Sequence, residues 1–166
     1  MINAITDSLI YDRTQADVDY ALMLERESIY TKELLRGAYN ASDRLRVAEA
    51  INYLASLVRL NSIHVRDDWN PISFAVQIAT VADNENTVEA LNVLKAFLPG
   101  ISATVPADLD RLSYNKANDV ERVLFELYGV YMRLNAFFVG DGYASDFDVG
   151  GGAQAFDDNW NFSFTL

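Results

Sequence analysis

The chain has 166 residues and no cysteine, and its 13 basic and 24 acidic side chains give a net charge of -11. This length can bury a hydrophobic core without a metal or disulfide, and the lack of cysteine excludes thiolate metal sites and cysteine nucleophiles. The negative charge opposes the counterion release that drives nucleic-acid binding, and no segment approaches the roughly 20 apolar residues that span a bilayer. We therefore expect a soluble domain with attached arms, without nucleic-acid or membrane partners.

The first elements are an N-terminal arm over residues 1–13 and a helix over residues 15–28. Thr14 and Asp17 predict the start of this helix, because together they form a short-armed capping box. Asn40 and Ser42 predict the start of a second helix over residues 42–60. Apolar side chains recur there at helical spacing, at Val47, Ile51, Leu54, Ala55 and Val58. The expected solvent face carries Arg46, Glu49 and Arg59.

Residues 62–80 mix aromatic and apolar side chains with aspartate, asparagine and Pro71, which predicts a connection with a turn. A third helix is expected from Asn86 to Phe97, capped by Asp83, Asn84 or Asn86 and ended by Pro99 and Gly100. Its apolar stripe consists of Val88, Leu91, Leu94 and Leu98.

A fourth helix is expected from Lys116 to Asn135, because its apolar residues alternate at spacings of three and four. These residues are Ala117, Val120, Leu124, Leu127, Tyr131 and Leu134. Such a seam requires a partner helix, and the second helix is the expected one.

The two halves of the chain show a weak internal repeat. Tyr39 and Asn40, followed by Arg46, can be set against Tyr114 and Asn115, followed by Arg122. Chance similarity between two capped helices is the alternative. The repeat predicts a mainly α fold, in which two helical hairpins pack as a small bundle over residues 14–135.

Residues 136–166 differ in composition, with glycine and aspartate interleaved and no basic side chain. The last seven residues alternate apolar and polar side chains, which predicts an extended, partly β arm. Its apolar face, a candidate partner-binding site, consists of Trp160, Phe162, Phe164 and Leu166. Docking on a neighbouring subunit and docking on the chain's own bundle are the two alternatives for this arm.

No catalytic, cofactor or metal site is expected. Asp146 and Asp148 lack the order of a calcium loop and its closing glutamate, so we interpret them as an acidic turn. The single histidine, His64, is interpreted as a connector residue, and no phosphate-binding loop is present. The helical carboxylates are interpreted as a solvated face, and they are Glu25, Glu27, Asp43, Glu49, Asp119, Glu121 and Glu126.

Several blocks resemble small proteins and domains encoded in the structural and tail gene regions of Firmicutes phages and prophages. The most specific block is Asp12-Arg13-Thr14-Gln15-Ala16-Asp17-Val18-Asp19. It is followed by Gly37-Ala38-Tyr39-Asn40-Ala41-Ser42-Asp43, Arg46-Val47 and Ala50-Ile51-Asn52-Tyr53-Leu54-Ala55. Shorter blocks extend the resemblance to about Asn135, at Asp68-Trp69, Asn92-Val93, Leu98-Pro99, Leu112-Ser113-Tyr114 and Ala117-Asn118-Asp119-Val120-Glu121. Residues 136–166 depart from the family's pattern.

The resemblance implies a non-enzymatic virion component near the tail, tail fibre or baseplate, made in the host bacterial cytoplasm. Its expected partners are other virion proteins or copies of itself, so a homo-oligomer is expected. One alternative is a soluble accessory or regulatory protein that binds a single partner. Another, a calcium-dependent binding module or glycan-directed hydrolase, would require the acidic loop to be an ion site.

Overall fold

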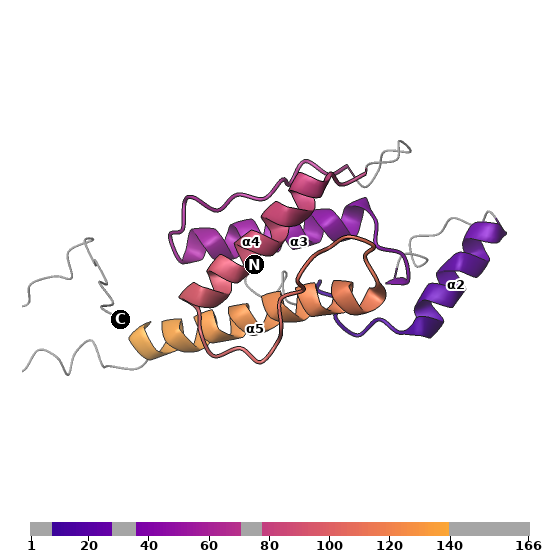
Figure 1. Ribbon diagram of the computed structural model, residues 1–166. Helices are drawn as coiled ribbons and strands as arrows, with labels where there is room; N and C mark the ends of the chain where they lie inside the picture. Colours follow the sequence, from indigo (N-terminus) through magenta and orange to yellow (C-terminus); the bar gives the residue numbers. More distant parts are fainter. Residues whose placement is uncertain (1–7, 28–35, 71–77, 140–166) are drawn as a thin grey trace, which may run out of the picture. The chain divides into compact units, whose positions relative to one another are not determined.

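A computed structural model describes residues 8–27, 36–70 and 78–139 of the chain (Figure 1). These residues form four helices and no strand: α2 (Gln15–Arg26), α3 (Ala41–Leu57), α4 (Val81–Phe97) and α5 (Tyr114–Val139). The prediction of a mainly helical protein is confirmed for this part of the chain.

Helix α2 begins where the capping box predicts. The Thr14 N–H donates to Asp17 Oδ2 over 2.7 Å, and the Asp17 N–H donates in return to Thr14 Oγ1 over 3.3 Å. The helix ends at Arg26, two residues before the predicted end. The turn after residue 35 passes close to this helix start, because a Cβ added to Gly37 would overlap the main-chain carbonyl of Asp17. Glycine at position 37 therefore allows two main-chain segments to touch.

Asn40 stands before α3, as predicted, and it forms a capping box with Asp43. Asn40 Oδ1 accepts from the Ser42 N–H over 2.8 Å, and the Asn40 N–H donates to Asp43 Oδ2 over 2.9 Å. The predicted apolar face is buried at Val47, Ile51, Leu54 and Ala55. The helix ends at Leu57, three residues before the predicted end at residue 60, and Arg59 then takes a positive φ of 57°. A residue in this left-handed region turns the chain out of the helix.

Helix α4 begins at Val81, so the predicted start at Asn86 is wrong. Thr80 is the N-cap: its N–H donates to Asp83 Oδ2 over 2.8 Å, and its hydroxyl accepts from the Asp83 N–H over 3.1 Å. Asp83 thus has a capping role, but as the third helical residue. The helix ends before Pro99 as predicted, and Leu91, Leu94 and Leu98 are buried.

Helix α5 begins two residues earlier and ends four residues later than predicted. Asn115, which the internal repeat sets against Asn40, lies inside the helix, so the two residues differ in their capping role. Ser113 stands before the helix, and its carbonyl accepts from the Ala117 N–H over 3.0 Å. The predicted seam is buried at Ala117, Val120, Leu124 and Leu127, whereas Leu134 is 44% exposed.

The hydrophobic core draws on α3, α4, α5 and the segments between them. Helices α3 and α4 pack directly against each other (Figure 1). Leu9, before α2, and Val65, after α3, also belong to the core. Residues 62–70 form no helix, as predicted, and Trp69 is buried.

Asn52 on α3 holds the connection that follows the helix. Its side-chain amide donates to the Val65 carbonyl and accepts from the Val65 N–H, both over 2.8 Å. One side chain therefore supplies both hydrogen bonds that a neighbouring strand would otherwise offer to residue 65.

The contacts divide the chain into two units, residues 1–131 and 132–166. In the second unit the described residues, 132–139, form the last turns of α5. The acidic turn with Asp146 and Asp148 lies outside the described residues. So does the predicted arm with Trp160, Phe162, Phe164 and Leu166.

Candidate functional site

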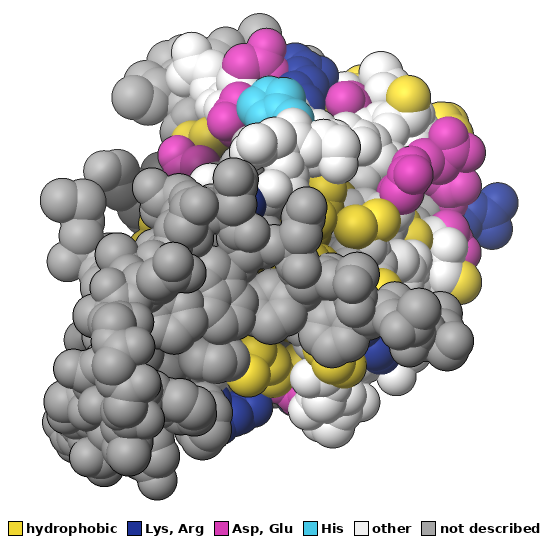
Figure 2. Space-filling view, turned by 90° about the vertical axis from the view of Figure 1, so that its left-hand side faces the viewer, with side chains coloured by type: hydrophobic (Ala, Val, Ile, Leu, Met, Phe, Trp, Pro, Cys, Tyr) yellow, Lys and Arg dark blue, Asp and Glu magenta, His cyan; other side chains and the backbone are white. Residues whose placement is uncertain are grey.

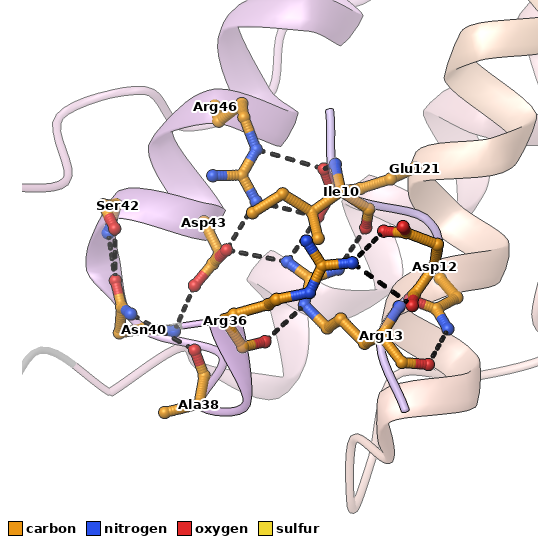
Figure 3. A network of polar contacts seen from close by, with 11 residues as sticks. Ile10, Asp12, Arg13, Arg36, Ala38, Asn40, Ser42, Asp43, Arg46 and Glu121 are labelled. Carbon is orange, nitrogen blue, oxygen red and sulfur yellow. Dashed lines mark hydrogen bonds and ion pairs between the residues drawn. The ribbon is translucent and has the colours of Figure 1, made fainter. Parts of the chain in front are cut away.

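Four charged side chains meet in the interior of the first unit, and we call them the ionic cluster (Figure 3). Arg13 comes from the segment before α2, Asp43 and Arg46 come from α3, and Glu121 comes from α5. The side chains of Arg13, Asp43 and Glu121 are at most 2% exposed, and that of Arg46 is 16% exposed. Two positive and two negative charges are therefore buried together and balance each other.

Glu121 is the acceptor at the centre of the ionic cluster. Its Oε1 accepts from Arg13 Nη2 over 2.8 Å and from Arg46 Nη2 over 2.9 Å. Its Oε2 accepts from Arg46 Nε over 3.0 Å and from the Ile10 N–H over 2.6 Å. The bidentate contact with Arg46 is the geometry in which a guanidinium and a carboxylate bind most strongly.

Asp43 links the ionic cluster to the start of α3. Its Oδ1 accepts from Arg13 Nη2 over 2.8 Å and from Arg46 Nη2 over 2.5 Å. Its Oδ2 accepts from the Asn40 N–H as part of the capping box. The same carboxylate therefore caps the helix and neutralises two buried guanidinium groups, which couples helix formation to packing.

Arg13 is fixed through both its side chain and its main chain. Its Nε donates to the Arg36 carbonyl over 3.0 Å, and its Nη1 donates to the Ile10 carbonyl. The amide of Asn118 on α5 accepts from the Arg13 N–H and donates to the Arg13 carbonyl, both over 2.9 Å. This pairing repeats that of Asn52 with Val65, so two helices each hold an extended segment with one asparagine.

A row of aromatic rings and guanidinium groups lies beside the ionic cluster. The Tyr39 ring centroid is 5.8 Å from the Arg13 guanidinium carbon and 5.4 Å from that of Arg44. The Trp69 ring centroid is 5.4 Å from the Arg44 guanidinium carbon and 4.3 Å from that of Arg66. Such contacts favour cations at the faces of the rings.

Burial and charge act on the protonation of two groups at this site. Burial raises the pKa of Tyr39 well above its ordinary value, and the nearby Glu121 carboxylate adds to the shift. Burial alone would lower the pKa of Arg46, but the hydrogen bonds and charge of Glu121, together with the charge of Asp43, raise it. Tyr39 is therefore neutral and Arg46 charged at physiological pH.

An outer ion pair completes the attachment of the N-terminal segment. Arg36 Nη2 lies 2.5 Å from Asp12 Oδ1, and Arg36 Nε lies 3.5 Å from Asp17 Oδ1. Hydrogen bonds from Thr14, with the charge of Arg36, hold the pKa of Asp17 below its ordinary value. These side chains are more exposed than the ionic cluster, so their contribution is screened by solvent.

The arrangement is suited to holding segments together. Every oxygen of Asp43 and Glu121 accepts at least one hydrogen bond, and both guanidinium groups are paired. Within the described residues, no buried side-chain nitrogen or oxygen lacks a hydrogen-bond partner. A buried ion pair that is fully satisfied fixes geometry, because breaking it exposes an uncompensated charge to a medium of low dielectric constant.

The interpretation of the helical carboxylates as a solvated face is wrong for Asp43 and Glu121, which are buried. Glu126 is half-buried, and its Oε2 accepts from the Ser102 N–H over 2.6 Å and from the Ala103 N–H over 2.9 Å. Arg46 is likewise in the ionic cluster and not on the expected solvent face. Glu49 and Asp119 are exposed as expected.

His64 lies at the surface of the connection after α3, where Figure 2 shows its side chain with acidic side chains nearby. Its carbonyl accepts from Asn86 Nδ2 over 3.1 Å. Among the described residues, no group of three or more histidine, aspartate or glutamate side chains is placed to hold a metal ion. No helix in the same residues is both long and apolar enough to cross a membrane.

The sequence does contain a signal for the ionic cluster: Asp43 and Glu121 stand on the apolar stripes of their helices. Glu121 stands at helical spacing between Ala117, Leu124 and Tyr128, all of which are buried. Asp43 stands in the same way before Val47, Ile51 and Leu54. A carboxylate on the apolar stripe of a helix must be buried with a counter-ion, and arginine is the usual partner.

Comparisons with protein-family models, with curated protein sequences and with solved structures find no match for this chain.

Proposed function

We propose that this chain is a non-enzymatic structural subunit of a bacteriophage or phage-like particle, associated with the tail, tail fibre or baseplate. It acts through contacts between subunits. The proposal includes the finer architecture, with two helical hairpins, α2–α3 and α4–α5, that form a bundle, and an extended, partly β arm over residues 136–166. In each half a shorter helix precedes a longer one: α2 has 12 residues and α3 has 17, and α4 has 17 residues and α5 has 26.

One observation carries the proposal: the blocks that resemble phage structural and tail-region proteins converge on the ionic cluster. The block at 12–19 supplies Arg13, the block at 37–43 supplies Asp43, and the block at 117–121 supplies Glu121. Arg46 stands in a fourth block, and Asn118 holds the main chain of Arg13. The resemblance therefore lies in residues that build a fold, which is what a family of structural subunits has in common.

The bonding within the ionic cluster supports a role without catalysis. A general acid or base needs a proton that it can exchange with a substrate, and a nucleophile needs an accessible lone pair. Asp43 and Glu121 instead direct their oxygens to arginine and to main-chain N–H groups inside the fold. The ionic cluster is thus suited to holding the fold rigid.

The proposal places contacts between subunits on the C-terminal arm. The part of the N-terminal arm that is described, residues 8–13, packs on its own chain through Leu9 and Arg13. The apolar residues Trp160, Phe162, Phe164 and Leu166 would each gain roughly 1.5–3 kcal/mol by complete burial, which favours a covered arm. We place them on a neighbouring subunit, by addition to a sheet or in a groove.

A soluble accessory protein that binds a single partner is the second candidate. The net charge of -11 favours it, because a strongly charged surface keeps a protein soluble and steers transient partners of opposite charge.

Particles of the phage or induced prophage that encodes the chain provide the test. After purification on a density gradient, mass spectrometry should find the chain in particles at a constant ratio to the other tail proteins. A chain abundant in the lysate but missing from purified particles would contradict the structural role and favour the accessory one.

Truncation after Gly152 tests the arm. Under the proposal, the truncated chain keeps the melting temperature of the full chain but no longer enters particles or self-associates. A much lower melting temperature would show that the arm packs on its own chain, and normal incorporation would show that the arm is not the assembly contact.

A further inference from the structure

A groove of about 600 Å³ lies between the outer face of α4 and the loop over residues 107–110. Its lining is mostly apolar and includes Val88 and Val93 from α4 and Leu109 from the loop. Val93 is 40% exposed, whereas Leu109 also belongs to the hydrophobic core. The groove therefore has an apolar floor that continues into the core and an outer wall open to solvent.

Acidic side chains lie on both sides of this floor. Glu85 and Glu89 stand one helical turn apart on α4, and Asp108 and Asp110 stand on the loop. Asp108 pairs with Lys116, but Glu85, Glu89 and Asp110 form no ion pair with another described residue. Among the described residues, no lysine or arginine is part of the groove lining, and Lys116 reaches its edge, where Nζ contacts Asp108 and the Asp110 carbonyl. An apolar floor between unpaired negative charges fits a ligand that is apolar in the middle and positive at its edges.

We propose that this groove binds a basic amphipathic segment of a partner protein, which places apolar side chains against Val88 and Leu109 and lysine or arginine beside Glu85, Glu89 and Asp110. The groove lies along a helix, and helix-lined apolar grooves bind amphipathic segments through side chains at helical spacing. Basic edges add specificity and speed of association, because opposite charges steer the encounter.

The negative charge of the groove disfavours other occupants, each of which is itself negatively charged. Residues 136–166 of the chain contain five aspartates and no basic residue, so this arm would meet repulsion at the groove. A second copy of the chain carries the same net charge of -11. Nucleic acid and anionic lipid are repelled for the same reason. The inference goes beyond the proposed function, since a virion subunit and an accessory protein could each use the groove.

The test uses the purified full-length chain and a synthetic 14-residue peptide of leucine and lysine, with leucine at helical spacing. A matched peptide in which glutamate replaces lysine is the control. We expect the lysine peptide to bind more weakly as salt is raised and the glutamate peptide not to bind. In NMR titrations, the amide signals of Val88, Val93 and Leu109 should move.

Matched variants locate the site. Glu89→Lys should weaken binding by about tenfold, roughly a loss of 1.4 kcal/mol, whereas Glu49→Lys, an equal charge change on an exposed position of α3, should leave it within about twofold. Val93→Ser should weaken binding, but Val81→Ser, at another exposed valine of α4, should not. Circular dichroism checks that all four variants are folded.

Equal weakening by Glu89→Lys and Glu49→Lys would overturn the proposal, because binding would then follow net charge alone. Signals that move only outside the groove would also overturn it. If analytical ultracentrifugation shows an oligomer that Glu89→Lys dissociates, the groove is occupied by a second copy and the proposal is wrong. None of these outcomes depends on whether the chain is found in particles.

Discussion

Replacing Glu121 with glutamine removes one negative charge from the ionic cluster and nearly preserves its shape. The carboxylate accepts four hydrogen bonds, from Arg13, the main chain of Ile10, and two nitrogens of Arg46. Glutamine has one oxygen and one NH₂ group, so two of the four donors would face another donor. Arg13 and Arg46 would also share a single buried carboxylate, that of Asp43.

The expected cost is large. Two lost hydrogen bonds to charged groups, at about 1.5–3 kcal/mol each, give roughly 3–6 kcal/mol. Breaking a buried ion pair by removing one partner gives about 3–5 kcal/mol by an independent route. For a chain of this length, a loss of about 3–5 kcal/mol lowers the melting temperature by roughly 6–20 °C.

Urea unfolding and thermal melts followed by circular dichroism measure the effect of Glu121→Gln. The control is Glu49→Gln on the exposed face of α3, which we expect to change the free energy of unfolding by no more than about 0.5 kcal/mol. Arg13→Met, made alone and together with Glu121→Gln, completes a double-mutant cycle. The double variant retains the neutral pair of Arg46 with Asp43, so it should lose less stability than the sum of the single variants.

A Glu121→Gln variant within about 0.5 kcal/mol of the natural chain would refute the reasoning, because it would mean that Glu121 is hydrated in the folded chain. If the losses in free energy of unfolding of the two single variants simply add in the double variant, Arg13 and Glu121 do not interact, which would also contradict the ionic cluster.

Three further predictions concern Asn118, Gly37 and Glu126. Asn118→Leu should cost about 1–3 kcal/mol and speed hydrogen exchange at the Arg13 amide, because both main-chain groups of Arg13 lose their partner; unchanged exchange would contradict it. Gly37→Ala should lower the free energy of unfolding, measured in urea, by about 1–3 kcal/mol, because the new Cβ overlaps the Asp17 carbonyl. Gly100→Ala is the control for backbone strain alone, since Gly100 has open space around it but a φ of 100°. Burial would raise the pKa of Glu126, but hydrogen bonds from Ala103 and Ser102 lower it below the ordinary value of 4.5. The charged carboxylate therefore stabilises the fold above pH 4.5, and this contribution is lost as the pH falls through the pKa of the folded chain. The stability difference from Glu126→Gln should therefore disappear in acid, and a difference that grows in acid would have the wrong sign.

Local signals in the sequence predicted the helices well. The starts of α2 and α3 depend on side chains within three residues of the helix, Thr14 with Asp17 and Asn40 with Asp43, so sequence alone identifies them. The start of α4 was missed although Thr80 and Asp83 have the same spacing. Three later capping candidates compete with Thr80 in the sequence, and only the hydrogen bonds of the folded chain select among them.

The candidate site was less predictable, because it joins residues that are distant in the sequence. Arg13 and Glu121 are 108 positions apart, and no local rule pairs them. Most acidic residues on helices are solvated, so the default interpretation favours the surface. Only the position of Glu121 on the apolar stripe of α5 indicates burial, and that position does not reveal which arginine is the partner.

The distance in sequence between Arg13 and Asn118 also affects how the chain is made. A ribosome adds about 5–20 residues per second, so the 105 positions between these partners take roughly 5–20 s to synthesise. During that interval Arg13 has neither Glu121 nor the amide of Asn118, and its guanidinium must stay hydrated. Helices α2, α3 and α4 can form locally as they emerge, but the segment before α2 can take its final position only once the first turns of α5 have left the ribosome. Completion of this domain therefore waits for the emergence of α5, the last of the described helices.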